Sequence, residues 1–161
     1  MLFFTGFSRH ASEIARKQVQ NTPKKKTELK AILAMVDEGL GLLSGKSDLL
    51  DFGRLLHEGW LLKRSLSDQI STPAVDEVYA AARKAGAVGG KLLGAGGGGF
   101  ILLFARPQDK PRIRKTLSGL LHVPFRFENS GSSIIFYDQN SREQEFSMLN
   151  GNSPARARSA R

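Results

Sequence analysis

The residues of this sequence with the most distinctive spacing form a run of glycines. Five glycines fall within six consecutive positions, in the order Gly94, Ala95, Gly96, Gly97, Gly98 and Gly99. Ordering a glycine costs more backbone entropy than ordering any other residue, and a simple hairpin turn needs only one or two. Such a run lets consecutive N–H groups converge on an anion, and Lys91 lies close by to add positive charge. Binding of a phosphate or carboxylate and tight packing against a helix are both open interpretations.

Three well-known glycine motifs do not fit this run. A dinucleotide-binding fingerprint must open a helix, whereas residues 100–103 continue as a strand. A P-loop requires Lys and then Ser or Thr after its last glycine, and here Phe100 and Ile101 follow. The protein-kinase loop does lie between strands, but the sequence contains neither H-R-D nor D-F-G.

A second candidate group lies on a predicted helix. His57, Trp60 and Arg64 follow one another at i, i+3 and i+7, and Lys63 is adjacent. A sugar phosphate could stack on Trp60 and pair with Lys63 or Arg64. The alternative is a partly buried tryptophan beside solvated bases. Arg9, just after the first predicted strand, is open to the same two interpretations.

Composition excludes several kinds of site and favours anionic ligands. The 161 residues are enough for about one domain, and the absence of cysteine excludes disulfides, thiolate zinc sites and cysteine nucleophiles. Because the sequence has only three histidines, a multi-histidine metal site is disfavoured. No pair of carboxylates has the spacing of an acid/base motif. The net charge of +9 favours phosphorylated metabolites or nucleic acids.

We expect no membrane span and a cytoplasmic location. The longest apolar run, residues 100–105, is far shorter than the roughly 20 residues that cross a bilayer. The first residues also lack the basic region, the longer apolar stretch and the cleavage site of a secretory signal.

Hydrophobic periodicity and turn residues predict an α+β domain. The predicted strands are residues 2–6, 87–93, 100–105, 124–127 and 132–137, and the predicted helices are 13–20 capped by Ser8, 27–43, 48–66, 73–86 and 107–121. This order favours a ferredoxin-like fold with helices on one face of a four-stranded antiparallel sheet. We assign residues 1–138 to the domain and 139–161 to a disordered tail, because apolar periodicity ends there.

Residues 89–100 resemble the third conserved motif of the GHMP small-molecule kinases. Residues 4–6 with Arg9, and the segments 62–67, 70–73 and 76–79, are similar to the branch of this family that phosphorylates D-glycero-D-manno-heptose 7-phosphate. The resemblance covers about residues 2 to 138.

The resemblance implies a C-terminal, ferredoxin-like kinase domain whose N-terminal nucleotide-binding partner domain, with the usual catalytic acid, is missing. Under it, the chain is truncated, its glycine loop lies near the transferred phosphate, and ATP and Mg²⁺ serve the complete enzyme. Arg9, Lys63, Arg64 and Ser71 become candidates for acceptor contacts, and no catalytic residue is assigned to this chain. The isolated chain is then expected to be inactive, and its docking face could drive self-association.

Two other classes of function remain open. A stand-alone module could bind a sugar phosphate or a protein partner without catalysis. Nucleic-acid binding is disfavoured, because the RNP aromatic pattern is missing and the basic residues are spread over several helices.

Overall fold

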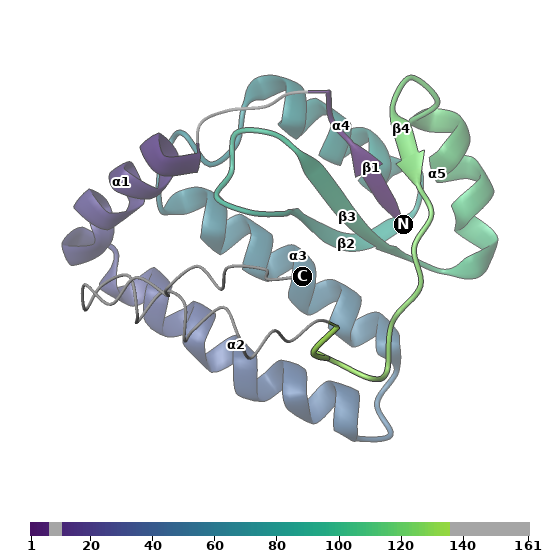
Figure 1. The fold of residues 1–161 in the computed structure, drawn as a ribbon, viewed down its shortest axis with the longest axis horizontal. Coiled ribbons are helices and arrows are strands. Elements are labelled where there is room, and N and C mark those ends of the chain that lie inside the picture. The colour runs from purple at the N-terminus through teal and green to yellow at the C-terminus, as the bar shows by residue number, and fades with distance from the viewer. Residues whose placement is uncertain (7–10, 136–161) are drawn as a thin grey trace, which may run out of the picture. The chain divides into compact units, whose positions relative to one another are not determined.

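The computed structural model describes residues 1–6 and 11–135 and divides into two units, Met1–Phe125 and Arg126–Arg161. The elements of the first unit, in chain order, are β1 (Leu2–Phe4), α1 (Ala11–Asn21), the 3-10 turn η1 (Thr22–Lys24), α2 (Lys26–Ser44), α3 (Leu49–Ser65), α4 (Pro73–Lys84), β2 (Ala87–Leu92), β3 (Phe100–Ala105), the 3-10 turn η2 (Pro107–Asp109), α5 (Lys110–Thr116) and β4 (Leu121–Val123) (Figure 1). No helix of this described part is both long enough and apolar enough to cross a membrane.

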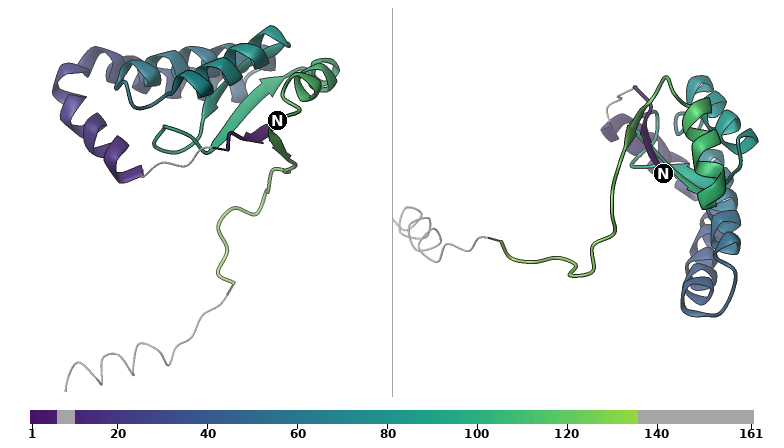
Figure 2. Two further views of the ribbon diagram at one scale, coloured as in Figure 1. Left: turned by 90° about the horizontal axis from the view of Figure 1, so that it is seen from above. Right: turned by 90° about the vertical axis from the view of Figure 1, so that its right-hand side faces the viewer.

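The four strands form one antiparallel sheet in the order β2-β3-β1-β4, which confirms the predicted ferredoxin-like α+β fold. Strand β1 lies in the middle, where Phe3 is opposite Ile101 on one side and His122 on the other. Helices α3, α4 and α5 lie on one side of this sheet (Figure 2). Phe3 and Ile101 are buried in the core beneath these helices, together with Trp60 of α3.

Capping side chains explain where two helices begin. The Asp48 carboxylate accepts a hydrogen bond from the Leu50 amide at the start of α3 (2.9 Å). The Thr72 hydroxyl accepts one from the Val75 amide (3.3 Å), and Pro73 fills the first position of α4, where no N–H is needed. The predicted helices 48–66 and 73–86 are thus confirmed, whereas the predicted cap Ser8 lies outside the described residues.

The sequence interpretation was wrong after residue 116. The predicted helix 107–121 is a 3-10 turn followed by the short α5, and residues 121–123 form β4 instead. Residues 124–127 and 132–135, predicted as strands, are not in strands, and 136–137 lie outside the described part. Pro124 lacks the N–H that a continuing ladder needs. The edge strand instead forms just before it, where His122 packs against Phe3 with ring centroids 5.1 Å apart.

Helix α3 touches strand β2 backbone to backbone. A Cβ atom added to Gly89 of β2 would overlap the carbonyl oxygen of Gly53 in α3, and one added to Gly53 would lie 2.9 Å from a Val88 methyl carbon. Only glycine permits this distance between a helix and a strand. The contact therefore sets the position of α3 over the sheet.

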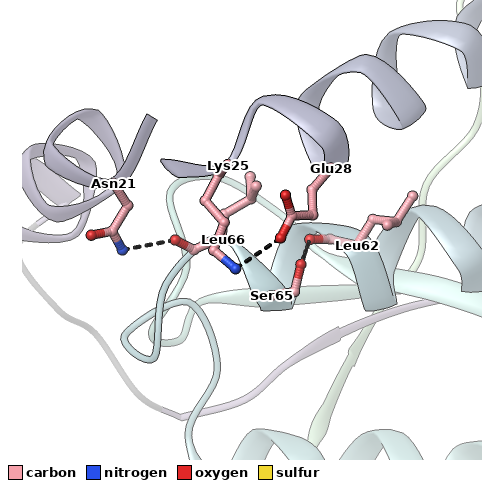
Figure 3. Close-up of polar contacts among 6 residues, drawn as sticks. All are labelled: Asn21, Lys25, Glu28, Leu62, Ser65 and Leu66. Carbon is pink, nitrogen blue, oxygen red and sulfur yellow. Dashed lines mark hydrogen bonds and ion pairs between the residues drawn. The ribbon is translucent and has the colours of Figure 1, made fainter. Parts of the chain in front are cut away.

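Polar contacts join the start of the helical layer to the end of α3 (Figure 3). The Asn21 side chain donates to the Leu66 carbonyl oxygen (2.9 Å), which binds the end of α1 to the turn after α3. Lys25 forms an ion pair with Glu28 (2.8 Å) in the first turn of α2, and the Ser65 hydroxyl donates to the Leu62 carbonyl oxygen (2.8 Å). The Asn21–Leu66 bond joins the two parts of the chain, while the other two bonds stabilise the first turn of α2 and the last turn of α3 locally.

The described residues of the second unit, 126–135, contain neither helix nor strand. Their local order comes from Glu128, whose carboxylate accepts bonds from the Asn129 amide (2.9 Å) and from the Ser130 hydroxyl (2.7 Å). The predicted domain boundary at 138 and the predicted tail 139–161 lie outside the described residues.

The Gly53–Gly89 contact can be tested by adding one methyl group. We expect Gly89→Ala to lower the free energy of unfolding by about 3 kcal/mol or more, because the overlap is with backbone that cannot move independently. Gly41→Ala is the matched control, since a Cβ there meets nothing within 4 Å. In the interior of α2 this change should stabilise by about 0.5–1 kcal/mol. Equal urea-unfolding midpoints for Gly89→Ala and the parent chain would contradict the assignment.

Candidate phosphate site at the glycine loop

The glycine run forms the loop between β2 and β3. The Leu93 amide donates to the Phe100 carbonyl oxygen across its base (2.8 Å). Four of the six predicted residues have positive φ: Gly94 (79°), Gly96 (125°), Gly97 (77°) and Gly99 (99°). L-residues with a side chain rarely adopt such angles, so the backbone path of this loop requires most of its glycines.

Side chains from three different elements bind the carbonyl groups of this loop. The donors and acceptors are Lys63 Nζ to Gly94 (2.6 Å), Gln18 Nε2 to Ala95 (2.8 Å) and Thr5 Oγ1 to Gly99 (2.9 Å). Thr5 is buried and also accepts from the Gly99 amide (3.1 Å). Sequence analysis did not assign Gln18 or Thr5 to the site, because bonds to backbone carbonyl groups leave no motif.

Part of the glycine run serves packing. The Gly97 amide donates to the Ile70 carbonyl oxygen (2.9 Å), and a Cβ on Gly96 would lie 2.7 Å from that same oxygen. By contrast, a Cβ on Gly94 or Gly99 would meet nothing within 4 Å. Tight packing therefore explains Gly96 and Gly97, whereas the open space at Gly94 and Gly99 is compatible with binding of an anion.

Four amides of the loop are left to bind something else. Within the described residues, no acceptor is recorded for the N–H groups of Gly94, Ala95, Gly96 or Gly98. Side chains occupy the carbonyl groups of Gly94, Ala95 and Gly99, whereas these four N–H groups have no such partner, so the loop can offer several donors to one ligand. Such a surface suits an anion.

Two lysines add positive charge to this end of the sheet. Burial lowers the pKa of Lys63, and the charge of Lys91 lowers it further. Neither lysine forms an ion pair with a carboxylate in the part of the chain that the structure describes. An anion placed here would relieve the repulsion between the two ammonium groups.

The structure brings Arg64 and Ser71 together away from these lysines. Both bind the Asp76 carboxylate, Arg64 at 2.5 Å and Ser71 at 2.6 Å. They line a separate hollow of about 300 Å³. Lys63, Lys91 and the glycine loop are not part of its lining. Asp76, in the first turn of α4, was not predicted as a site residue. Arg9 lies outside the described residues.

Stacking of a sugar on Trp60 is not possible in this structure. The side chain is only 1% exposed and packs in the core against Tyr79, with ring centroids 6.2 Å apart. Its neighbour His57 lies with Nδ1 2.7 Å from the Tyr79 hydroxyl oxygen. Burial lowers the pKa of His57, with Arg83 lowering it further, and burial raises the pKa of Tyr79 to about 12. One hydrogen bond thus joins two neutral side chains at neutral pH.

Comparison with known families places this geometry among kinases. Residues 29–121 match the family model described as the C-terminal domain of the GHMP kinases. The D-glycero-alpha-D-manno-heptose 7-phosphate kinase of Campylobacter jejuni is 28% identical over 119 residues, which cover 73% of this chain and 35% of that protein. The mevalonate kinase of Pyrococcus horikoshii is 33% identical over 106 residues, covering 63% of this chain and 31% of that protein.

Solved structures share the fold. Mevalonate kinase of L. major, in complex with R-mevalonate, superimposes with a TM-score of 0.63 at 23% identity, covering 73% of this chain and 37% of that one. The Methanococcus jannaschii mevalonate kinase gives a TM-score of 0.56 at 26% identity, covering 73% and 35%. The chain thus spans about a third of the length of these relatives.

Because Gly96 packs against Ile70 and Gly94 faces open space, adding one methyl group should destabilise the fold more at Gly96 than at Gly94. Gly96→Ala should destabilise by about 3 kcal/mol, because strained φ adds to overlap with the Ile70 backbone. Gly94→Ala should cost about 1–2 kcal/mol, from φ strain alone. Urea unfolding measures the loss of unfolding free energy in each variant relative to the parent chain. Equal losses would show that Ile70 does not limit the loop.

The His57–Tyr79 pair predicts a dependence of stability on pH. Because the folded state lowers the pKa of His57, the unfolded chain binds this proton first as pH falls below about 6.5. The contribution of His57 to stability is therefore complete above that pH and is lost at lower pH. NMR titration should place the His57 pKa below 6.5, and His57→Gln should reduce the loss of stability between about pH 7 and 5. A His57 pKa above 6.5 would reverse the sign and contradict the prediction.

Proposed function

This chain belongs to the GHMP kinase family through its C-terminal domain, and on that premise we propose that it is part of an ATP-dependent sugar-phosphate kinase. The proposed substrate is D-glycero-D-manno-heptose 7-phosphate, phosphorylated in the cytoplasm for synthesis of nucleotide-activated heptose for surface polysaccharide. Support comes from the similarity to the Campylobacter jejuni enzyme and from the net charge of +9, which favours a phosphorylated substrate. The remaining parts of the site would come from a nucleotide-binding domain of the same family.

The observation that carries the proposal is the set of open donors at the glycine loop. The amides of Gly94, Ala95, Gly96 and Gly98 have no acceptor among the described residues, and Lys63 and Lys91 add charge beside them. Phosphoryl transfer depends mainly on positioning the groups and neutralising negative charge. We assign to this loop the binding of a phosphate group during that reaction.

The anchoring of the loop suits this role. Lys63 and the side chains of Gln18 and Thr5 hold three of its carbonyl groups, so little reorganisation would be needed when a phosphate arrives. ATP fits these residues only through its phosphates. The described residues contain no group of three or more acidic or histidine side chains that could hold a metal by themselves. Mg²⁺ usually binds through one or two carboxylates together with substrate phosphates, and we propose that ATP and the rest of the complete enzyme supply those ligands.

We assign a structural role to Arg64 and Ser71, which both bind Asp76 of α4, rather than direct binding of substrate. The Asp76 carboxylate already occupies both polar groups. Arg9 stays a candidate contact for the acceptor. Because the proposed catalytic acid and nucleotide loop belong to another domain, we propose that the 161-residue chain alone transfers no phosphate.

Substrate binding by the isolated chain is the first test. Saturating D-glycero-D-manno-heptose 7-phosphate, at 100 times its Kd, should stabilise the chain by about 2.7 kcal/mol in thermal unfolding. Heptose without the phosphate should have no effect. Lys91→Gln should weaken the stabilisation, whereas Lys110→Gln, an exposed lysine at the start of α5, should not. Equal stabilisation by inorganic phosphate and by the sugar phosphate would overturn the proposed substrate.

Activity needs a second test. A chimera that carries this chain in place of the matched region of the Campylobacter jejuni enzyme should release ADP with heptose 7-phosphate, while the chain alone should not. Lys91→Gln in the chimera should slow that release. A folded, nucleotide-binding chimera without activity would favour a non-catalytic sugar-phosphate or partner-binding module. Turnover by the chain alone would overturn its proposed inactivity.

A further inference from the structure

An apolar groove runs between α2 and α3. It has a volume of about 650 Å³, and its walls come from α2, α3, Leu66 and Lys91 of β2. Apart from Lys63 and Lys91, every residue that lines it is apolar or glycine. On the α2 side its walls include Val36, Leu40 and Leu43, which are more than half exposed. This volume is within the usual range for small-ligand sites, about 300–1,000 Å³.

The groove has one charged end. Lys63 lies near the end of α3, beside the first turn of α2, and Lys91 is close enough to lower its pKa. The opposite end is formed by Leu43 and Phe52, where α2 ends and α3 begins. From Leu29 to Leu43 the α2 wall is about 21 Å long, at 1.5 Å per residue. A long apolar channel thus leads away from two cations.

The same wall contains a buried polar atom without a partner. Trp60 precedes Lys63 by three positions, which places both on one face of α3. Its Nε1 atom is buried and has no hydrogen-bond partner among the described residues. The lining contains no carboxylate, so the charged end offers N–H donors and no anionic acceptor. An anion at this end would supply an acceptor to the two lysine ammonium groups.

We propose that this groove binds a long-chain carboxylate, an amphipathic anion with a single alkyl chain. The carboxylate lies at Lys63 and Lys91, and the alkyl chain lies along the α2–α3 groove. Lys63 keeps its bond to the Gly94 carbonyl oxygen and retains two further N–H donors. The proposal does not rest on the kinase assignment, but it uses the same two lysines as the proposed phosphate, so the two ligands compete for them.

A second copy of this chain fits the groove less well. A symmetric dimer would place the same surface on both sides, and that surface has two lysines and no acidic residue. Pairing would bury like charges without a counterion, which disfavours association. A ligand that carries its own negative charge resolves this mismatch.

Binding is measured with the full chain and dodecanoate, kept below its micelle-forming concentration. Trp60 is the only tryptophan of the sequence, so intrinsic fluorescence reports on the groove directly. We expect a saturable change with dodecanoate, and about tenfold weaker binding of decanoate, the fold-change expected for two buried methylenes. Dodecanol, of equal chain length but uncharged, should bind at least tenfold more weakly than dodecanoate. Lys91→Gln should reduce that difference.

A matched pair of substitutions separates the groove from the rest of α2. Leu40→Asp places a charge in the groove and should abolish binding, whereas Leu33→Asp, equally exposed on α2 but outside the lining, should not. Circular dichroism confirms that both variants fold. No saturable signal in fluorescence or calorimetry, equal binding of dodecanol, or loss of binding in both variants would overturn the proposal. A parent dimer that Leu40→Asp converts to a monomer would assign the groove to a second copy instead.

Discussion

The contact between Gly53 and Gly89 determines where the positive charges of this domain lie. Because α3 touches β2 at its backbone, the helix has a fixed height and direction over the sheet. Lys63 is carried by α3 and Lys91 by β2, so the same contact sets the separation of the two ammonium groups. The glycine loop begins where β2 ends and is bound by Lys63, which makes its position depend on that contact as well.

The glycine loop combines two properties that sequence patterns do not distinguish. Gly96 and Gly97 lie against the Ile70 backbone, where the structure has no room for a side chain at Gly96. Gly94 and Gly99 are required by their φ angles alone. Three of its carbonyl groups are bound by side chains of α3, of α1 and of Thr5 beside β1, which restrains the loop without a ligand. Its remaining amides are therefore presented in a fixed arrangement, as binding of a compact anion requires.

Local sequence signals predicted much of the fold, and long-range packing accounts for the errors. The predicted helices 48–66 and 73–86 were confirmed and begin beside the caps Asp48 and Thr72, and the strand-loop-strand pattern around the glycines was confirmed. After α5, alternation alone could not choose between residues 121–123 and 124–127, because pairing with β1 decides which segment becomes the strand. Helical spacing placed Trp60 beside Arg64 but could not show that Tyr79 would cover it. The partners of Arg64 and Ser71 also depended on Asp76, which only the tertiary fold brings near both.

The two walls of the apolar groove differ in how firmly they are held, and this has a consequence for motion. Helix α3 is fixed on the sheet by its glycine contact, whereas α2 packs mainly against α3 and is joined to it by the short segment 45–48. Rocking of α2 about that segment would widen or narrow the groove without moving Lys63 or Lys91. The amides of α2 should accordingly exchange with solvent faster than those of α3. The width of the groove then varies with time, while the two lysines at its charged end keep their positions.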